Sequence, residues 1–319
     1  MRLKPDGFII IMALVILCAR LFPSLSEILP FDQISFIGIV VIFFFYGLKL
    51  SPDKLRRELS NTRLHILIQA TTFLIFPLIV LGGAALAGIS FKEPVWLGLL
   101  FLSALPSTVS TSVVMVSMAK GNVSAAIFNA SISGLIGIIV TPLWMSLAIK
   151  TSGYGGHLSD IYLKLLVEVI LPVRSGMFMQ RYLGEWAITN TKRIAVFDRG
   201  IILLIIFKSF AHAFRERIFE TVSATILILV AAVVIGLFFL IYYLTGFLSQ
   251  QLSFSRADTI TARYCGTKKS LVHGTVFSGI LFGHGAATGL LLLPLMIFHA
   301  FQILYISAAA AREGRKIVQ

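Results

Sequence analysis

Long apolar stretches separated by short polar loops set the pattern of this 319-residue chain. A helix needs about 20 mostly apolar residues to cross a bilayer. Backbone groups inside lipid must hydrogen-bond within their own segment, so these stretches predict helices rather than strands. We predict an all-α membrane protein, one polytopic domain over 1–319. Its ten spans are predicted at 7–23, 34–50, 65–88, 94–118, 123–148, 159–182, 196–213, 222–248, 257–281 and 286–309.

The composition supports a chain that lives in lipid. Hydrophobic residues make up 57% of it and charged residues 13%, and the mean hydropathy is +0.93. A soluble domain carries roughly 25% charged residues, and a soluble enzyme could not keep so much apolar surface from water. The net charge of +13 is better explained by basic cytoplasmic loops than by nucleic acid. The expected partner is therefore the lipid bilayer, and no nucleic acid.

The distribution of Lys and Arg among the loops predicts the orientation. With the N-terminus in the cytoplasm, the loops on that side carry most of them, including those in 54–63 and 312–316. Basic loops stay in the cytoplasm, so we place both termini there, in the plasma (inner) membrane of a bacterium. The loop 213–221 is the exception, because it puts Arg215 and Arg217 outside.

The fourth segment is interrupted by Pro106 and six hydroxyl side chains within 103–112. Proline removes a backbone donor and clashes with the preceding turn. So dense a polar cluster at membrane depth is typical of a cavity lining. The alternative is a kinked helix whose hydroxyls bond to their own carbonyls. We predict non-helical backbone near 105–110.

The ninth segment is interrupted by Lys268 and Lys269, within the polar run 263–274. A lysine at membrane depth costs at least about 2.5 kcal/mol and is tolerated when it faces protein or water. If 257–270 were instead a loop, the apolar remainder would be too short to cross. We therefore predict a broken span with non-helical backbone near 263–268.

The two breaks fall at corresponding positions, in the fourth segment of the first five and of the second five. Because five is odd, the two halves have opposite orientations. The prediction is two inverted five-helix repeats, about 7–150 and 159–311, with discontinuous helices 4 and 9. Such matched breaks point to the binding site of a secondary transporter.

The helices after the breaks add candidate residues. In the fifth span, small or polar residues recur every four positions and form one helix face, at Ala125, Asn129, Ser133 and Gly137. We expect the amide of Asn129 to serve the site rather than the core. In the tenth span, His299 and Gln302 serve either the site or an interhelical hydrogen bond. Lys208 is a candidate partner for Glu168 in helix packing.

Several motifs resemble those of the bile acid:sodium symporter superfamily, in particular its SBF-like branch. They lie at 43–50, 121–143, 257–259, 265–271 and 293–304, and the resemblance covers nearly the whole chain. It implies ten helices in a panel domain and a core domain. It also implies that the broken fourth and ninth helices cross in the core, with alternating access to an organic-anion site beside the crossing.

The sequence departs from this family at its sodium site. The resemblance implies a Glu and a Gln four residues apart in the ninth helix, and Cys265 and Lys269 stand at those positions. No metal site is therefore carried over. Lys269 lies four residues after Cys265 and four before His273, so we expect all three to share one helical face. The ammonium of Lys269 has the charge of sodium and is a candidate replacement for it, with His273 as proton relay. H⁺ and Na⁺ both remain candidate coupling ions. The alternative is that Lys269 is a fixed charge holding a helix-end carbonyl.

The candidate site combines the two breaks with the helices that follow them. Its predicted residues, for substrate or ion, are Ser107, Thr108, Thr111, Ser112, Asn129, Ser133, Cys265, Thr267, Lys269, Ser270, His273 and Gln302.

The predicted function is secondary active transport of an organic anion, a bile-acid-like, steroid-like or other amphipathic solute, without a need for sodium. The alternative is a non-transporting membrane regulator of ion (calcium) homeostasis that keeps the fold. The sequence holds neither a nucleotide-binding loop nor a catalytic motif, so we expect no enzyme activity and no cofactor. The oligomeric state stays open.

Overall fold

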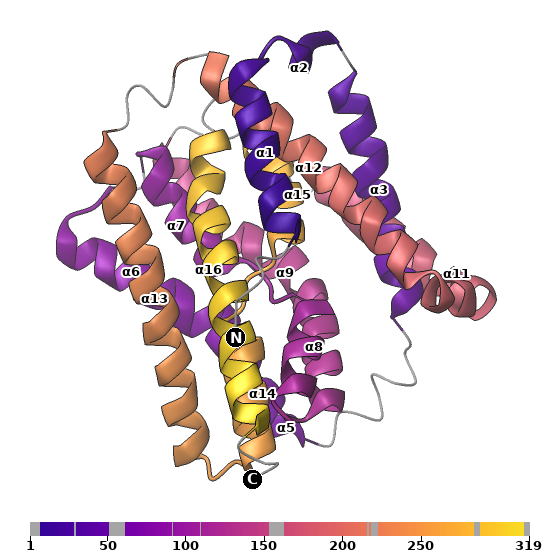
Figure 1. The fold of residues 1–319 in the computed structure, drawn as a ribbon, viewed down its shortest axis with the longest axis vertical. Helices are drawn as coiled ribbons and strands as arrows, with labels where there is room; N and C mark the ends of the chain where they lie inside the picture. The colour runs from indigo at the N-terminus through magenta and orange to yellow at the C-terminus, as the bar shows by residue number, and fades with distance from the viewer. Residues whose placement is uncertain are drawn as a thin grey trace.

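The computed structural model describes residues 7–28, 30–50, 61–90, 92–108, 110–152, 163–215, 217, 223–283 and 288–315, and all regular secondary structure in these ranges is helical (Figure 1). This confirms the all-α class for the described residues. The helices are α1 (Gly7–Leu21), α2 (Leu25–Ile28), α3 (Phe31–Lys49), α5 (Thr62–Ala70), α6 (Phe76–Ala87), α7 (Pro94–Ala104), α8 (Ser110–Met118), α9 (Val123–Ser152), α11 (Leu171–Thr189), α12 (Thr191–Arg215), α13 (Ala224–Gln251), α14 (Arg256–Thr267), α15 (Leu271–Phe282) and α16 (Thr288–Arg315). Two π-helical turns, η2 (Thr71–Ile75) and η3 (Leu166–Ile170), precede α6 and α11.

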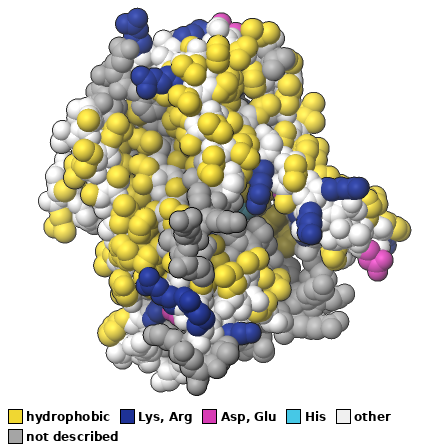
Figure 2. Space-filling view, viewed as in Figure 1, with side chains coloured by type: hydrophobic (Ala, Val, Ile, Leu, Met, Phe, Trp, Pro, Cys, Tyr) yellow, Lys and Arg dark blue, Asp and Glu magenta, His cyan; other side chains and the backbone are white. Residues whose placement is uncertain are grey.

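Several helices suit a bilayer. Five helical stretches are long and apolar enough to cross one: Phe31–Lys49, Thr62–Ala87, Val123–Ala148, Ala224–Gln251 and Thr288–Arg315. Two shorter apolar helices, Ile10–Leu21 and Pro94–Ala104, accompany them. Hydrophobic side chains cover much of the face seen in Figure 2, as a surface in contact with lipid requires. The chain is a multi-pass membrane protein, while the count of ten spans and their inverted repeat stay predictions.

Both predicted interruptions are breaks in helices. The first separates α7 from α8, and the second separates α14 from α15. Figure 1 shows α7 and α15 toward one end of the molecule and α8 and α14 toward the other. The second break lies at Lys268–Ser270 and overlaps the predicted 263–268 only at Lys268, because α14 continues to Thr267. Ser270 is the N-cap of α15 and accepts from His273 N at 3.3 Å. A capping residue adopts extended backbone, so Ser270 is the last residue of the break and α15 begins after it.

The helices pack as two groups. The scaffold group comprises α1, α3, α11 and α12, and the break group comprises α5 to α9 and α13 to α16. Within the scaffold group, a Cβ on Gly47 of α3 would overlap the backbone of Val173, and one on Gly176 of α11 would overlap that of Phe44. Small residues permit this close approach of membrane helices. Contacts from α12 to α15 and α16 join the two groups.

Candidate functional site

The first break leaves carbonyl groups that their own helix cannot satisfy. α7 ends at Ala104, and Pro106 has no N–H with which to continue the helical hydrogen bonds. Other elements supply the missing donors. Thr141 Oγ1 of α9 donates to Ala104 O at 2.8 Å, and Ser270 N donates to Pro106 O at 2.9 Å. The two breaks are therefore joined directly through Pro106 and Ser270.

Lys269 satisfies more of these carbonyls with its side chain. The residue is fully buried. Its Nζ donates to three backbone carbonyl oxygens, those of Ser103 at 2.6 Å, Thr72 at 2.7 Å and Leu105 at 2.9 Å. An ammonium has three protons, so all three are engaged. The ammonium also lies 4.6 Å from the ring centroid of Phe76, a cation–π contact. A cation at the C-terminal end of α7 opposes the dipole of that helix.

A second proline explains why the carbonyl of Thr72 is available. The π-helical turn η2 shifts the hydrogen bonds by one residue, and Pro77 lacks an N–H. The carbonyls of Thr72 and Phe73 are thereby left without a donor from their own helix. Thr72 O receives the ammonium, and Phe73 O accepts from Trp144 Nε1 at 2.7 Å. Side chains from other helices thus replace the missing bonds, as membrane helices with proline require.

Gln302 of α16 holds the backbone of the second break. Its Oε1 accepts from Lys269 N at 2.9 Å, and its Nε2 donates to Lys269 O at 2.8 Å. The same Nε2 lies 3.0 Å from Nδ1 of His299. The predicted Gln302 therefore reaches the break, and His299 contacts it through Gln302.

The neighbouring lysine, Lys268, faces hydroxyl groups. It is fully buried as well, and its Nζ donates to Thr111 Oγ1 at 2.9 Å and to Met115 Sδ at 3.3 Å. Thr108 Oγ1 lies 2.9 Å from Thr111 Oγ1 and 3.0 Å from Ser112 Oγ. Because hydroxyls donate as well as accept, this cluster and the ammonium can together supply donors to an anion.

The predicted small-residue face of α9 packs against the first break. Ser133 Oγ accepts from Ser107 N at 2.9 Å. A Cβ on Gly137 would overlap the ring of Pro106, so only a glycine allows this approach. The hydroxyl of Ser107 is buried and has no hydrogen-bond partner among the described residues.

Asn129 lies one turn earlier on the same face and bonds to α5. Its Nδ2 is 2.7 Å from His65 Nδ1 and donates to Ala125 O at 2.9 Å. Gln69 Nε2 donates to its Oδ1 at 3.1 Å. The amide therefore ties α9 to α5, and its role in a binding site stays a prediction.

The single face predicted for Cys265, Lys269 and His273 is wrong, because the break interrupts the helix between them. Cys265 and Thr267 are fully buried at the end of α14. His273 belongs to α15, and its Nδ1 lies 3.0 Å from Ser270 Oγ. Since the three protons of Lys269 go to carbonyls, a direct relay from Lys269 to His273 is not among these contacts.

The predicted set omitted residues that contact its members, among them His65, Gln69, Thr72 and Lys268. Lys268 had a clear signal, because it stands beside Lys269 in the same polar run. The other three come from the third segment, where Pro77 in an apolar stretch is the one sign of freed carbonyls.

Broken membrane helices that meet in the interior are a recurring feature of transporters. Residues 6–314 match the SBF-like CPA transporter family, and the chain belongs to it. The resemblance carried by the sequence motifs is confirmed.

Relatives of similar length are named as transporters. The chain is 33% identical over 315 residues to the putative symporter YfeH of Escherichia coli (strain K12), covering 98% of this chain and 94% of the relative. It is 30% identical over 310 residues to sodium/bile acid cotransporter 7-B of Xenopus laevis, covering 95% and 90%. It is also 30% identical over 309 residues to sodium/bile acid cotransporter 7 of Rattus norvegicus, covering 95% and 91%. The family and these names indicate a membrane transporter rather than an enzyme.

Proposed function

We propose that this protein is a secondary active transporter of an organic anion that works by alternating access. In this proposal ten spans form two inverted repeats, about 7–150 and 159–311, and the broken helices cross in mid-membrane. The observation that carries it is the pair of fully buried lysines, Lys268 and Lys269, in the second break. Within the described residues, none of their hydrogen-bond partners is a carboxylate. A buried cation without an acidic partner favours a negatively charged ligand.

The two lysines have different tasks in this proposal. Lys269 serves as a built-in cation, because three carbonyl oxygens surround its Nζ at 2.6 to 2.9 Å. Transport then needs no sodium and is either proton-linked or uncoupled. Lys268, with the hydroxyls of Thr108, Thr111 and Ser112, binds the anion. The names of the relatives support an amphipathic anion of the bile-acid or steroid type as the substrate.

Uptake into proteoliposomes tests the proposal. Radiolabelled bile acids and steroid sulfates are offered to the wild type with sodium present and with sodium replaced by choline, across pH. We expect equal uptake in both salts. Lys268→Gln should raise KM for the anion, whereas Lys269→Gln should change the pH or sodium dependence. Strict sodium dependence of the wild type would contradict the assignment of Lys269, and no uptake of any solute would favour a non-transporting regulator.

We propose further that both termini lie in the cytoplasm, with the protein in a bacterial inner membrane. The concentration of Lys and Arg in the loops on the side of the termini supports this orientation. Fusion of a periplasm-dependent and a cytoplasm-dependent reporter enzyme to the C-terminus tests it. Activity of the periplasmic reporter alone would show that the C-terminus lies outside the cytoplasm and would contradict this proposal.

A further inference from the structure

A cavity of about 770 Å³ lies between the scaffold group and α15. Its walls come from α2, α3, η3, α12 and the end of α15. The proposed orientation puts this end of the molecule outside the cell. The cavity is lined by basic and acidic side chains together: Lys164, Lys208, His212 and Arg215 on one hand, and Glu27, Asp32 and Glu168 on the other. Its volume is typical of a site for a small organic ligand.

Ion pairs at the rim of the cavity tie α2 and α3 to α12. Lys208 pairs with Asp32, and not with Glu168 as the sequence suggested, although Glu168 lines the same cavity. Arg215 pairs with Glu27. The side chains of Asp32 and Glu27 are 69% and 61% exposed, so solvent weakens both pairs. The rim is therefore held by contacts that a moderate movement of the helices can break.

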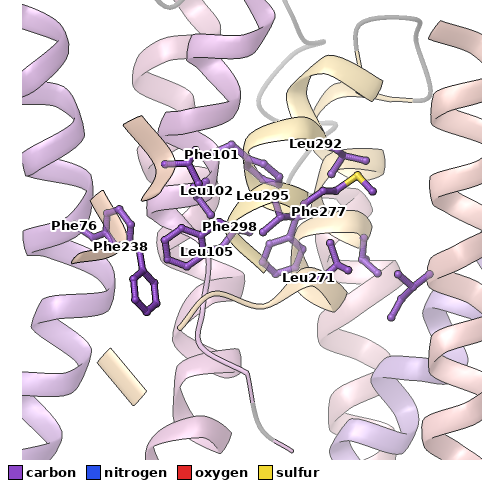
Figure 3. Close-up of a cluster of buried hydrophobic side chains, with 14 of the residues drawn as sticks. Phe76, Phe101, Leu102, Leu105, Phe238, Leu271, Phe277, Leu292, Leu295 and Phe298 are labelled. Atoms are coloured by element: carbon purple, nitrogen blue, oxygen red, sulfur yellow. The ribbon is translucent and has the colours of Figure 1, made fainter. Parts of the chain in front are cut away.

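A layer of aromatic rings lies one helical turn from the lining of the cavity. Ile39 of α3 lines the cavity, and one turn deeper Phe43 stacks on Phe277 of α15, with centroids 6.4 Å apart and rings within 7° of parallel. The ring of His273 lies 5.7 Å from those of both Phe43 and Tyr46. We name Phe43, Tyr46, His273 and Phe277 the aromatic seal. Figure 3 shows Phe277 among the buried side chains packed near the breaks.

The aromatic seal lies next to the breaks on its inner side. His273 Nδ1 is 3.0 Å from Oγ of Ser270, which belongs to the second break. Tyr46 donates its hydroxyl proton to Ser131 O of α9. Among the described residues, His273 Nε2 and Ser107 Oγ are buried without hydrogen-bond partners. Buried polar atoms are rarely left unpaired, so this layer is suited to receive a polar solute.

We propose that the cavity is the outer entrance for the transported solute and that the aromatic seal is the gate between this entrance and the breaks. The proposal rests on the proposed function, since a gate matters only if solutes pass. α3 belongs to the scaffold group and α15 to the break group, so a movement of one group against the other separates Phe43 from Phe277.

Thiol labelling tests this route without requiring transport. In a Cys18→Ala/Cys265→Ala background, Ser26→Cys reports on the cavity, and Ser107→Cys reports on the first break, where the hydroxyl has no partner to lose. Intact cells are treated with a membrane-impermeant anionic methanethiosulfonate. We expect fast labelling of Ser26→Cys and slow labelling of Ser107→Cys. Phe43→Ala should speed the labelling of Ser107→Cys by about tenfold or more, which is about 1.4 kcal/mol in the closing equilibrium.

A matched control separates the gate from general loosening. Phe238 of α13 is also fully buried but lies outside the aromatic seal, so Phe238→Ala should leave the labelling of Ser107→Cys unchanged. If size-exclusion chromatography shows that Phe43→Ala does not fold, Phe43→Leu replaces it. Leucine leaves a smaller gap, so it should speed the labelling of Ser107→Cys by less.

Two results would overturn the proposal: equal labelling of Ser107→Cys with the intact and the truncated seal, or labelling of Ser26→Cys only from the cytoplasmic side. Labelling as expected in a protein that takes up no solute would contradict the proposed function, while still supporting the seal as the barrier on this route.

Discussion

Replacing Lys269 by methionine, and comparing the result with Lys268→Met, tests whether one ammonium holds the two breaks together. The two lysines are adjacent and both fully buried. Each substitution relieves the cost of keeping an ammonium away from water, and this relief is about the same for both. The difference in free energy of unfolding between the two variants therefore reports which groups lose their hydrogen-bond partner when each lysine is removed.

Lys269→Met leaves three carbonyls, those of Thr72, Ser103 and Leu105, without the donor they have in the wild type. A buried polar group left unpaired costs about 1–3 kcal/mol, so the three together cost about 3–9 kcal/mol. Methionine fills the apolar part of the space but offers no proton.

Lys268→Met leaves less behind. The hydroxyl of Thr111 keeps Thr108 as a partner at 2.9 Å, and the sulfur of Met115 is a weak acceptor that loses little. We therefore expect Lys269→Met to be less stable than Lys268→Met by at least about 2 kcal/mol, the lower end of the carbonyl cost minus what remains on the hydroxyl side.

Thermal unfolding in detergent, followed by fluorescence-detected size exclusion, shows which of the two variants is the less stable. Equal stability, or Lys268→Met as the weaker of the two, would refute the account of Lys269. A second comparison uses Lys269→Ala and Lys268→Ala in sodium chloride and in choline chloride at equal ionic strength. If the three carbonyls form a cation site, sodium at ten times its Kd should stabilise Lys269→Ala by about 1.4 kcal/mol. It should leave Lys268→Ala and the wild type unchanged.

The remaining predictions concern single side chains. Ser270→Ala removes the cap of α15 and should lower the free energy of unfolding by about 0.5–2 kcal/mol; Ser255→Ala, at the exposed cap of α14, is the comparison and should cost less in the same thermal assay. Gln302→Leu leaves the backbone N–H and carbonyl of Lys269 unpaired and should lower the free energy of unfolding by about 2–6 kcal/mol. A melting temperature near that of the wild type would show that these two hydrogen bonds contribute little to stability. Asn129→Leu should abolish uptake into proteoliposomes while the protein stays monodisperse, and normal uptake would make this amide a packing residue.

The breaks were predictable because they are local signals. Pro106 and the hydroxyls around it, and two lysines in an apolar stretch, violate the pattern of a lipid-facing helix wherever the rest of the chain lies. The end of α14 was less predictable. Arg263 to Thr267 continue the helix although they are polar, because protein rather than lipid surrounds them, and the cap at Ser270 fixes where the next helix begins.

The partners across the breaks could not be predicted in the same way. Lys269 reaches Thr72, which is 197 residues away in the sequence, and no local pattern shows which freed carbonyl meets which donor. Lys208 illustrates the same difficulty, because its choice between Asp32 and Glu168 depends on how α12 sits against α3. The family resemblance supplied the approximate meeting of the fourth and ninth helices, but the carbonyl contacts follow from the positions of Pro77 and Pro106.

The contrast between the two lysines bears on how a transporter site of this kind can select charge. The ammonium of Lys269 is held by three carbonyl oxygens and the end of α7, so its protons are already engaged. The ammonium of Lys268 has one hydroxyl and one sulfur as partners, and neither brings a negative charge. Of the two ammonium groups, that of Lys268 therefore has the weaker set of partners, and it lies beside hydroxyls that can turn their protons toward an incoming oxygen. Under the proposed function, an anion that enters there would gain a buried partner, whereas a cation would meet like charge.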